Sequence, residues 1–335
     1  MFQISFLAIA MATEIIVKSN ASDEKAQPRK PSIKKLGTID CDMVETTPII
    51  LHNRLYRFEY VRANYKLNNK IPLPPSSKGE SDSYFRFIDV ESGESTPAFA
   101  AGYHLGSAYV EDDTAYVYGV DTWGAANIQV FWSKDLKEWS SKPALTLPGW
   151  GIYNTSVCKG PERYIMAFEI DKPPEETGMG FTMRFAESND LLNWKLTASD
   201  CVYSKDRYTA CPALRFLDGF YYMVYLEARP GHTYESYIVC SQDLVHWESS
   251  PFNPMLQFSN EDKKIGNPNL TAEQRERIAK AVNRNNSDVD LCEFKGQVII
   301  YYSWGDQQGT EFLAQAVYNG TLENFFRGFF PEESL

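Results

Sequence analysis

Apolar and aromatic runs alternate with short polar turns along most of the chain. In the clearest copy, an apolar run at 212–216 is followed by the hairpin signal Asp218-Gly219 and an aromatic, β-branched run at 220–226. A third run at 236–240 leads into the polar segment Ser-Gln-Asp-Leu-Val-His-Trp, which ends at Trp247. This pattern predicts three antiparallel strands and a closing turn.

The closing turn has two further copies in the chain. They are WSKDLKEW, which ends at Trp139, and ESNDLLNW, which ends at Trp194, so the tryptophans are separated by 55 residues (139 to 194) and 53 residues (194 to 247). Two more pairs of strand-like runs begin at Thr46 and Ser287. A nearly constant period of this length indicates repeated supersecondary units. We therefore predict an all-β fold, a five-bladed β-propeller with its inner strands around a central channel.

Two segments lie outside this repeat. Residues 1–36 are predicted to be a flexible N-terminal segment and a possible signal peptide, although no Lys or Arg precedes the apolar run at 2–12. Residues 37–335 then form the propeller domain, and 37–43 offer a strand that closes the ring. Residues 271–283 have a helical pattern with a capping-box start, which predicts one helical insertion between blades four and five.

Composition narrows the classes of partner. The net charge of −11 argues against a nucleic-acid partner, which requires a clustered basic face. No stretch has the length of an apolar membrane span. The six cysteines show no metal-binding spacing, so we expect no cofactor, with a structural Ca²⁺ as an open alternative. The apolar N-terminal run favours a periplasmic or secreted location over a cytoplasmic one.

The repeated unit also resembles a known family. A Pro-containing apolar strand, a hairpin, a Tyr-rich strand and the turn Ser-x-Asp-Leu-x-x-Trp are similar to the blades of the five-bladed propeller glycoside hydrolases, which include the family-43 arabinofuranosidases and xylosidases. The resemblance covers about residues 37–330. It implies a hydrolase that cleaves a terminal sugar from a plant or algal polysaccharide or oligosaccharide, with inversion if it follows the family-43 habit. Such a reaction requires a proton donor and a second carboxylate.

The acids of the chain depart from the pattern of that family. The resemblance implies an Asp on blade one, an Asp on blade two and a Glu on blade three, each at the start of an inner strand. Here blade one has Asp42 and Glu45, whereas blades two and three have His104 and Asn154. A second set of acids stands at the far ends of the paired strands, among them Glu169 and Glu227. We expect Asp42 or Glu45 to act as the base and Glu169 or Glu227 as the acid.

Sugar hydroxyls are bound by polar side chains and sugar faces by aromatic rings, which defines a wider set of candidates. The predicted substrate-binding residues are His104, Asp121, Trp150, Asn154, Arg207, His232, Asp288 and Trp304. His104 and His232 are also alternative acids. Each candidate has a structural alternative: strand-end acids form surface ion pairs, Asp42 is a turn residue, and the tryptophans pack in the core.

Two other functions remain open at this point. A glycoside phosphorylase or transferase of the same fold requires a phosphate site, for which Arg184, Arg207 and Arg229 are the candidates. A non-catalytic carbohydrate-binding propeller explains the missing acids of blades two and three directly. A pair of carboxylates in the channel mouth distinguishes the hydrolase from the binding protein.

Overall fold

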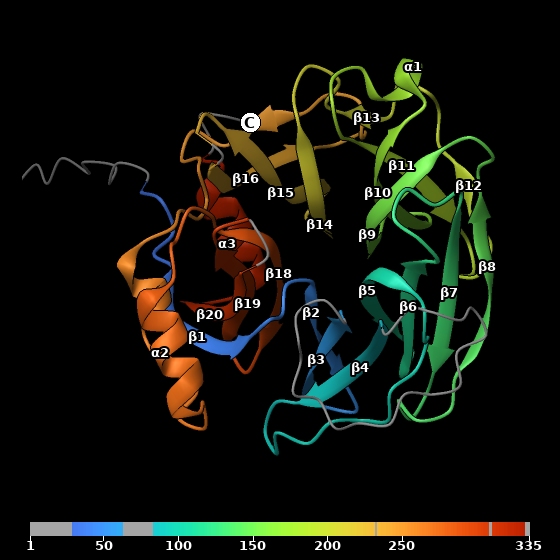
Figure 1. Cartoon of the computed structure of the whole chain (residues 1–335). Helices are drawn as coiled ribbons and strands as arrows, with labels where there is room; N and C mark the ends of the chain where they lie inside the picture. Colours follow the sequence, from blue (N-terminus) through green and yellow to red (C-terminus); the bar gives the residue numbers. More distant parts are fainter. Residues whose placement is uncertain (1–28, 63–82, 232, 308–309, 332–335) are drawn as a thin grey trace, which may run out of the picture.

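Five antiparallel sheets stand around a central axis, one for each blade (Figure 1). The computed structural model describes residues 29–62, 83–231, 233–307 and 310–331. The predicted five-bladed β-propeller is confirmed. The innermost strands are β2, β5, β9, β14 and β18; each contacts the next around the ring, and β18 contacts β2. Their first residues therefore surround one end of the central channel.

The strands of each blade follow one another in the chain, except in the last blade. Blade one contains β2 (Thr46–Leu51), β3 (Arg54–Val61) and β4 (Tyr84–Asp89). Blade two contains β5 (His104–Glu111), β6 (Thr114–Val120), β7 (Asn127–Ser133) and β8 (Ser140–Thr146). Blade three contains β9 (Gly151–Lys159), β10 (Tyr164–Lys172), β11 (Thr182–Ser188) and β12 (Lys195–Leu196), with β13 (Val202–Tyr203) also paired to β11. Blade four contains β14 (Thr209–Leu217), β15 (Phe220–Arg229), β16 (Thr233–Ser241) and β17 (Glu248–Ser249). Blade five contains β18 (Ser287–Phe294), β19 (Gln297–Gly305), β20 (Glu311–Asn319) and β1 (Lys34–Cys41).

Blade five is completed by a strand from the beginning of the chain. Strand β1 pairs antiparallel with β20, from Lys34 opposite Val317 to Cys41 opposite Phe312. This strand includes most of the segment 37–43 that was expected to close the ring. The pairing provides hydrogen-bond partners for the backbone N–H and C=O groups of β20, and without it β20 would be an open edge strand.

The repeated turn has the same hydrogen bonds in three blades. In blade three, Ser188 Oγ accepts a hydrogen bond from Leu191 N (3.0 Å), and Asp190 Oδ1 accepts from Leu192 N (2.9 Å) and Asn193 N (2.8 Å). The turn places Leu191 at φ 63° with its side chain buried. Equivalent bonds to the Ser and Asp recur at 133–138 and 241–246. The Ser-x-Asp-Leu sequence recurs in these three blades because the Ser and Asp side chains cap the turn.

The inserted helix lies at the outside of the ring (Figure 1). Helix α2 (Ala272–Lys280) follows a 3₁₀ turn, η2 (Asn260–Lys263), in the connection from blade four to blade five, which confirms the predicted insertion. Its capping box is formed by Thr271 Oγ1, which accepts from Gln274 N (3.2 Å), and Gln274 Oε1, which accepts from Thr271 N (2.8 Å). In Figure 1 the helix lies beside β1. Two further helices, α1 (Pro174–Thr177) and α3 (Leu322–Phe329), were not predicted.

The closure of the ring by β1 leads us to a prediction about stability. Lys35 of β1 is buried and forms an ion pair with the fully buried Asp262 (2.7 Å) and a hydrogen bond with Asn286 Oδ1 (2.7 Å). Lys35→Met keeps the aliphatic stem but leaves the Asp262 charge without its cation, so we expect the free energy of unfolding to fall by about 3–5 kcal/mol. Urea denaturation measures this change in the free energy of unfolding.

Lys195→Met is the matched control for this variant. Lys195 also pairs with a carboxylate, Glu187, but its side chain is 75% exposed. Water screens such a pair, so the control should unfold at the urea concentration of the wild-type protein. Equal midpoints for both variants would show that the Lys35 ion pair does not stabilise the closure.

Candidate active site

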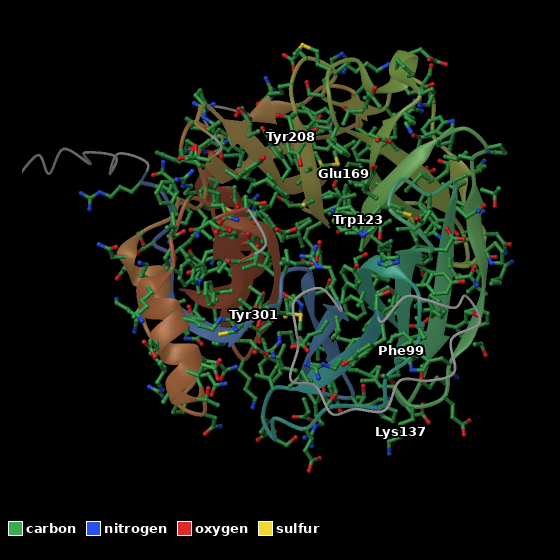
Figure 2. The ribbon with its side chains drawn as sticks, in the orientation of Figure 1. Phe99, Trp123, Lys137, Glu169, Tyr208 and Tyr301 are labelled. Atoms are coloured by element: carbon green, nitrogen blue, oxygen red, sulfur yellow. The ribbon has the colours of Figure 1, made fainter. Side chains whose placement is uncertain are left out.

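A cavity of about 310 Å³ opens at the end of the channel where the inner strands begin. Each blade contributes residues from the beginning of its inner strand or directly before it: Glu45, Leu105, Tyr153, Asn154, Cys211 and Asp288. Further lining residues come from neighbouring strands and loops: Val44, Arg62, Trp123, Glu169, Phe181, Tyr208, Leu226, Gln307 and Glu311. In Figure 2, Glu169 lies between Trp123 and Tyr208 near the centre of the ring.

Backbone irregularities place several of these side chains. The inner strands β5, β14 and β18 each shift register where they begin, and the residue within the shift has a positive φ: Leu105 (52°), Cys211 (52°) and Asp288 (51°). Non-glycine residues rarely adopt this conformation, and bulges of this kind re-aim a side chain at functional sites. The same device in three blades directs three side chains into the cavity.

Glu169 of β10 and Glu45 are buried carboxyl groups that face the cavity from blades three and one. The side chain of Glu169 accepts hydrogen bonds at a single oxygen, Oε2, from Asn154 Nδ2 (3.0 Å) and from Cys211 N (3.0 Å). The residue is 3% exposed. Burial raises the pKa of Glu169 to about 7, and the negative charges of Asp288 and Glu45 add to the rise.

Glu45 directly precedes β2 and is the second of these carboxyl groups. It is 9% exposed, and its Oε2 lies 3.7 Å from Arg62 Nη2. Burial raises the pKa of Glu45 to about 7; the charge of Arg62 opposes this rise, and that of Asp288 adds to it. Each of the two glutamates therefore changes its charge near neutral pH.

Blade five adds two more acids to the cavity. Asp288 Oδ2 accepts hydrogen bonds from Ser287 Oγ (2.6 Å) and Ser303 Oγ (3.0 Å). Glu311 Oε1 accepts from Gln307 N (2.9 Å), and burial, followed by the charge of Asp288, raises the pKa of Glu311 to about 8. Glu311 was not predicted as a site residue. The signal was its position, because the first residue of a third strand lies at the same end of the blade as the start of the inner strand.

Two of the predicted acids and bases lie away from the cavity lining. Asp42 accepts hydrogen bonds at both oxygens from Arg277 of α2 (2.8 and 2.5 Å), so it joins the inserted helix to the ring. Glu227 accepts from Tyr225 Oη (2.9 Å) and Arg229 Nη1 (3.1 Å), and Leu226 lines the cavity instead. Neither position supports a role in proton transfer.

Several predicted substrate-binding residues are also engaged elsewhere. His104 Nδ1 is 2.7 Å from Tyr60 Oη, and the next residue, Leu105, lines the cavity. Arg207 Nη2 donates to Tyr203 Oη (3.1 Å), and its Nε is 3.7 Å from Glu227. Asp121 is not among the cavity-lining residues, and His232 lies outside the described residues.

The two predicted tryptophan platforms are packed in the blades. Trp304 is fully buried, stacks on Phe312 with centroids 4.5 Å apart and donates from Nε1 to Thr38 Oγ1 (2.9 Å). It therefore has no face for a sugar, and this prediction was wrong. Trp150 packs against Phe168 (6.3 Å) under the Arg184 guanidinium (5.6 Å). The tryptophan that lines the cavity is Trp123.

No metal site is apparent in the part of the chain that the structure describes, since no three His, Cys, Asp or Glu side chains there form a group that holds an ion. That no cofactor is required stays a prediction. Among the described helices, none combines the length and the apolar character needed to cross a bilayer.

Comparison with known proteins identifies the fold. No family model matches the chain, and no curated protein matches it in sequence. A solved structure described as a glycoside hydrolase has a TM-score of 0.59 at 13% identity, over 86% of this chain and 92% of that one. An α-L-arabinofuranosidase from Podospora anserina in complex with cellotriose has a TM-score of 0.56 at 9% identity, over 88% and 98%. A family-43 β-xylosidase/α-arabinofuranosidase from a compost metagenome in complex with xylotriose has a TM-score of 0.51 at 14% identity, over 87% and 94%. The chain thus has the propeller fold of these glycoside hydrolases.

The buried acids predict how stability depends on pH. The pKa of Glu169 is higher in the folded protein than in the unfolded chain, so its contribution to stability is complete below about pH 4 and is lost as the pH rises through about 7. Glu169→Gln removes this charge, and we expect it to raise the Tm at pH 8 by several degrees and to change it little at pH 5. Scanning calorimetry at both pH values measures the difference.

Glu138→Gln, at an exposed position, is the control and should leave the Tm unchanged at both pH values. A Tm rise of the same size at pH 5 and pH 8 in the Glu169 variant would contradict the ionisation argument.

Proposed function

We propose that the chain is a glycoside hydrolase that removes a terminal sugar from a plant or algal oligosaccharide or polysaccharide. The observation that carries this proposal is the pair Glu45 and Glu169, which face one cavity from blades one and three and have pKa values raised to about 7. Glycoside hydrolysis uses two carboxyl groups on opposite sides of the scissile bond, one protonated and one ionised. The complexes of the structural neighbours with cellotriose and xylotriose are consistent with a carbohydrate in this cavity.

The surroundings of the two glutamates suggest their roles. Glu169 acts as the general acid, because its hydrogen bonds with Asn154 and Cys211 both end on Oε2 and leave Oε1 to carry the proton. Glu45 acts as the general base, because Arg62, 3.7 Å away, favours its ionised form. Glu169 protonates the leaving oxygen while Glu45 removes a proton from the attacking water. Attack from the side opposite the leaving group inverts the configuration.

The remaining cavity residues support the recognition of a single terminal ring. A volume of about 310 Å³ lies at the lower end of the range of small-molecule pockets, about 300–1,000 Å³. Asp288, Glu311 and Asn154 present oxygen acceptors to the hydroxyl groups of a sugar. A cavity of this size at the channel end favours cleavage from the end of a chain.

The phosphorylase alternative has less support. Of the arginines considered for phosphate, Arg184 pairs with Glu176 and lies over the Trp150 ring, while Arg207 and Arg229 pair with Glu227. Among the described residues that line the cavity, the cation is Arg62, and it lies beside Glu45. A phosphate dianion would meet four carboxyl groups in this cavity.

The first test is a screen of the purified protein against aryl glycosides and plant and algal oligosaccharides, with and without phosphate. We expect sugar release that does not depend on phosphate. Release that requires phosphate would establish a phosphorylase. Absence of any release, with sugar binding detectable by calorimetry, would establish a non-catalytic binding protein.

Single variants then test the two roles. Glu45→Gln should lower kcat about 10²–10⁴-fold on all substrates, whereas Glu169→Gln should do so on oligosaccharides and much less on dinitrophenyl glycosides, whose leaving group needs no proton. Glu227→Gln is the control at a strand end outside the cavity lining and should keep wild-type rates. Wild-type rates in both the Glu45 and Glu169 variants would exclude the proposed pair.

The raised pKa values also predict the pH profile. Protonation of Glu45 should lower kcat/KM below about pH 7, and ionisation of Glu169 should lower it above about pH 7, which gives a bell with its maximum near neutrality. The residual kcat/KM of Glu169→Gln should no longer fall on the alkaline side of the profile. A maximum near pH 4, where unperturbed carboxyl groups titrate, would contradict the assignment.

A further inference from the structure

The two sides of the cavity differ in chemical character. Three of the four acids come from blades one and five and form one side: Glu45, Asp288 and Glu311. Aromatic residues from blades two, three and four form the other side: Trp123, Tyr153, Phe181 and Tyr208. A sugar ring has C–H groups on its faces and hydroxyl groups at its edge, so both sides of this cavity have a counterpart on one sugar.

The aromatic residues form a continuous series. Trp123 and Tyr153 have ring centroids 6.4 Å apart, Tyr153 and Phe181 5.0 Å, and Phe181 and Tyr208 5.2 Å. All three contacts are edge to face, with interplanar angles of 77–88°. The hydroxyl of Tyr153 donates to Asp171 Oδ2 (2.9 Å), which fixes the second ring of the series. The series is therefore a packed surface and not a set of separate side chains.

Trp123 extends this surface out of the cavity. Its side chain is 53% exposed, while the other three rings of the series are partly buried. The turn after it is kept close to Tyr153 by Gly124 at φ 69°, where a Cβ would lie 3.1 Å from Tyr153 Oη. An exposed tryptophan that is held in position beside a polar cavity is typical of a recognition surface.

Tyr153 connects this tryptophan with the proposed acid. Its ring centroid lies 6.4 Å from that of Trp123, and the next residue, Asn154, donates a hydrogen bond to Glu169 Oε2 (3.0 Å). A ligand group on Trp123 therefore lies on the side of the cavity from which Glu169 would protonate the leaving oxygen. The cavity holds about one ring, so the group on Trp123 belongs to the next unit of the same substrate.

We propose that Trp123 is the stacking platform for the second sugar unit of the substrate, the unit released as the leaving group. This inference rests on the proposed function. It defines the substrate as the end of an oligosaccharide whose second unit is a pyranose with equatorial hydroxyl groups, since such a ring presents a flat C–H face to an indole. A small aglycone such as a methyl group does not reach the platform.

The experiment compares two substrates of the sugar that the screen identifies, its methyl glycoside and its trisaccharide. Trp123→Ala should lower kcat/KM for the trisaccharide about tenfold, which corresponds to about 1.4 kcal/mol. It should change kcat/KM for the methyl glycoside less than about twofold. Trp123→Tyr should restore most of the loss. Phe258→Ala, which removes another partly exposed aromatic ring (38% exposed), is the matched control and should affect neither substrate.

An equal loss of kcat/KM on both substrates in Trp123→Ala, or no loss on the trisaccharide, would overturn the proposal that Trp123 is a stacking platform. If the protein hydrolyses nothing, the proposed function fails, and calorimetry with cellotriose, xylotriose and the matching monosaccharides still tests the platform. Trisaccharide binding that weakens in Trp123→Ala but not in Phe258→Ala supports it. Trisaccharide binding that both variants keep, or no binding by the wild-type protein, overturns it.

Discussion

The antiparallel pairing of β1 with β20 is the constraint on which the rest of the structure depends. It joins the beginning of the chain to its end, so that the five inner strands form a closed ring in which each packs on the next. Glu45 stands between β1 and β2, and the segment that closes the ring therefore also positions the proposed base. The cavity combines Glu45 of blade one with Asp288 of blade five, which are neighbours only in a closed ring.

The fold could be predicted from the sequence because its repeating feature is local. The bonds of the blade turn join residues at most three positions apart, such as Ser188 to Leu191 and Asp190 to Asn193. Each copy therefore needs the same residues in the same order, and the period is visible in the sequence alone. The ring closure joins Lys34 to Val317 and leaves no such trace, so the sequence could only offer a candidate strand for it.

The site could be predicted only in part, because a strand alternates its side chains between its two faces. Glu169 and Glu227 both stand near the ends of paired strands, yet Glu169 lines the cavity, while in blade four Leu226 does so and Glu227 points to Arg229. Alternation places neighbours such as Leu226 and Glu227 on opposite faces of the strand, and the sequence does not show which of the two faces the cavity. Glu45, Asn154 and Asp288 were predicted because they lie near the beginning of an inner strand, where the blades surround the end of the channel.

The charges of the cavity explain why a rigid ring suits this chemistry. Glu45, Glu169 and Glu311 share one small space with Asp288, and burial together with the charge of Asp288 opposes the ionisation of the three glutamates. A flexible site would relieve the repulsion by moving the acids apart or into water, and their pKa values would return to the ordinary range. Here the acids extend from strands that are hydrogen-bonded within their blades and packed between neighbours, so the unfavourable arrangement persists. The stability that the ring provides elsewhere maintains two carboxyl groups that exchange protons near neutral pH.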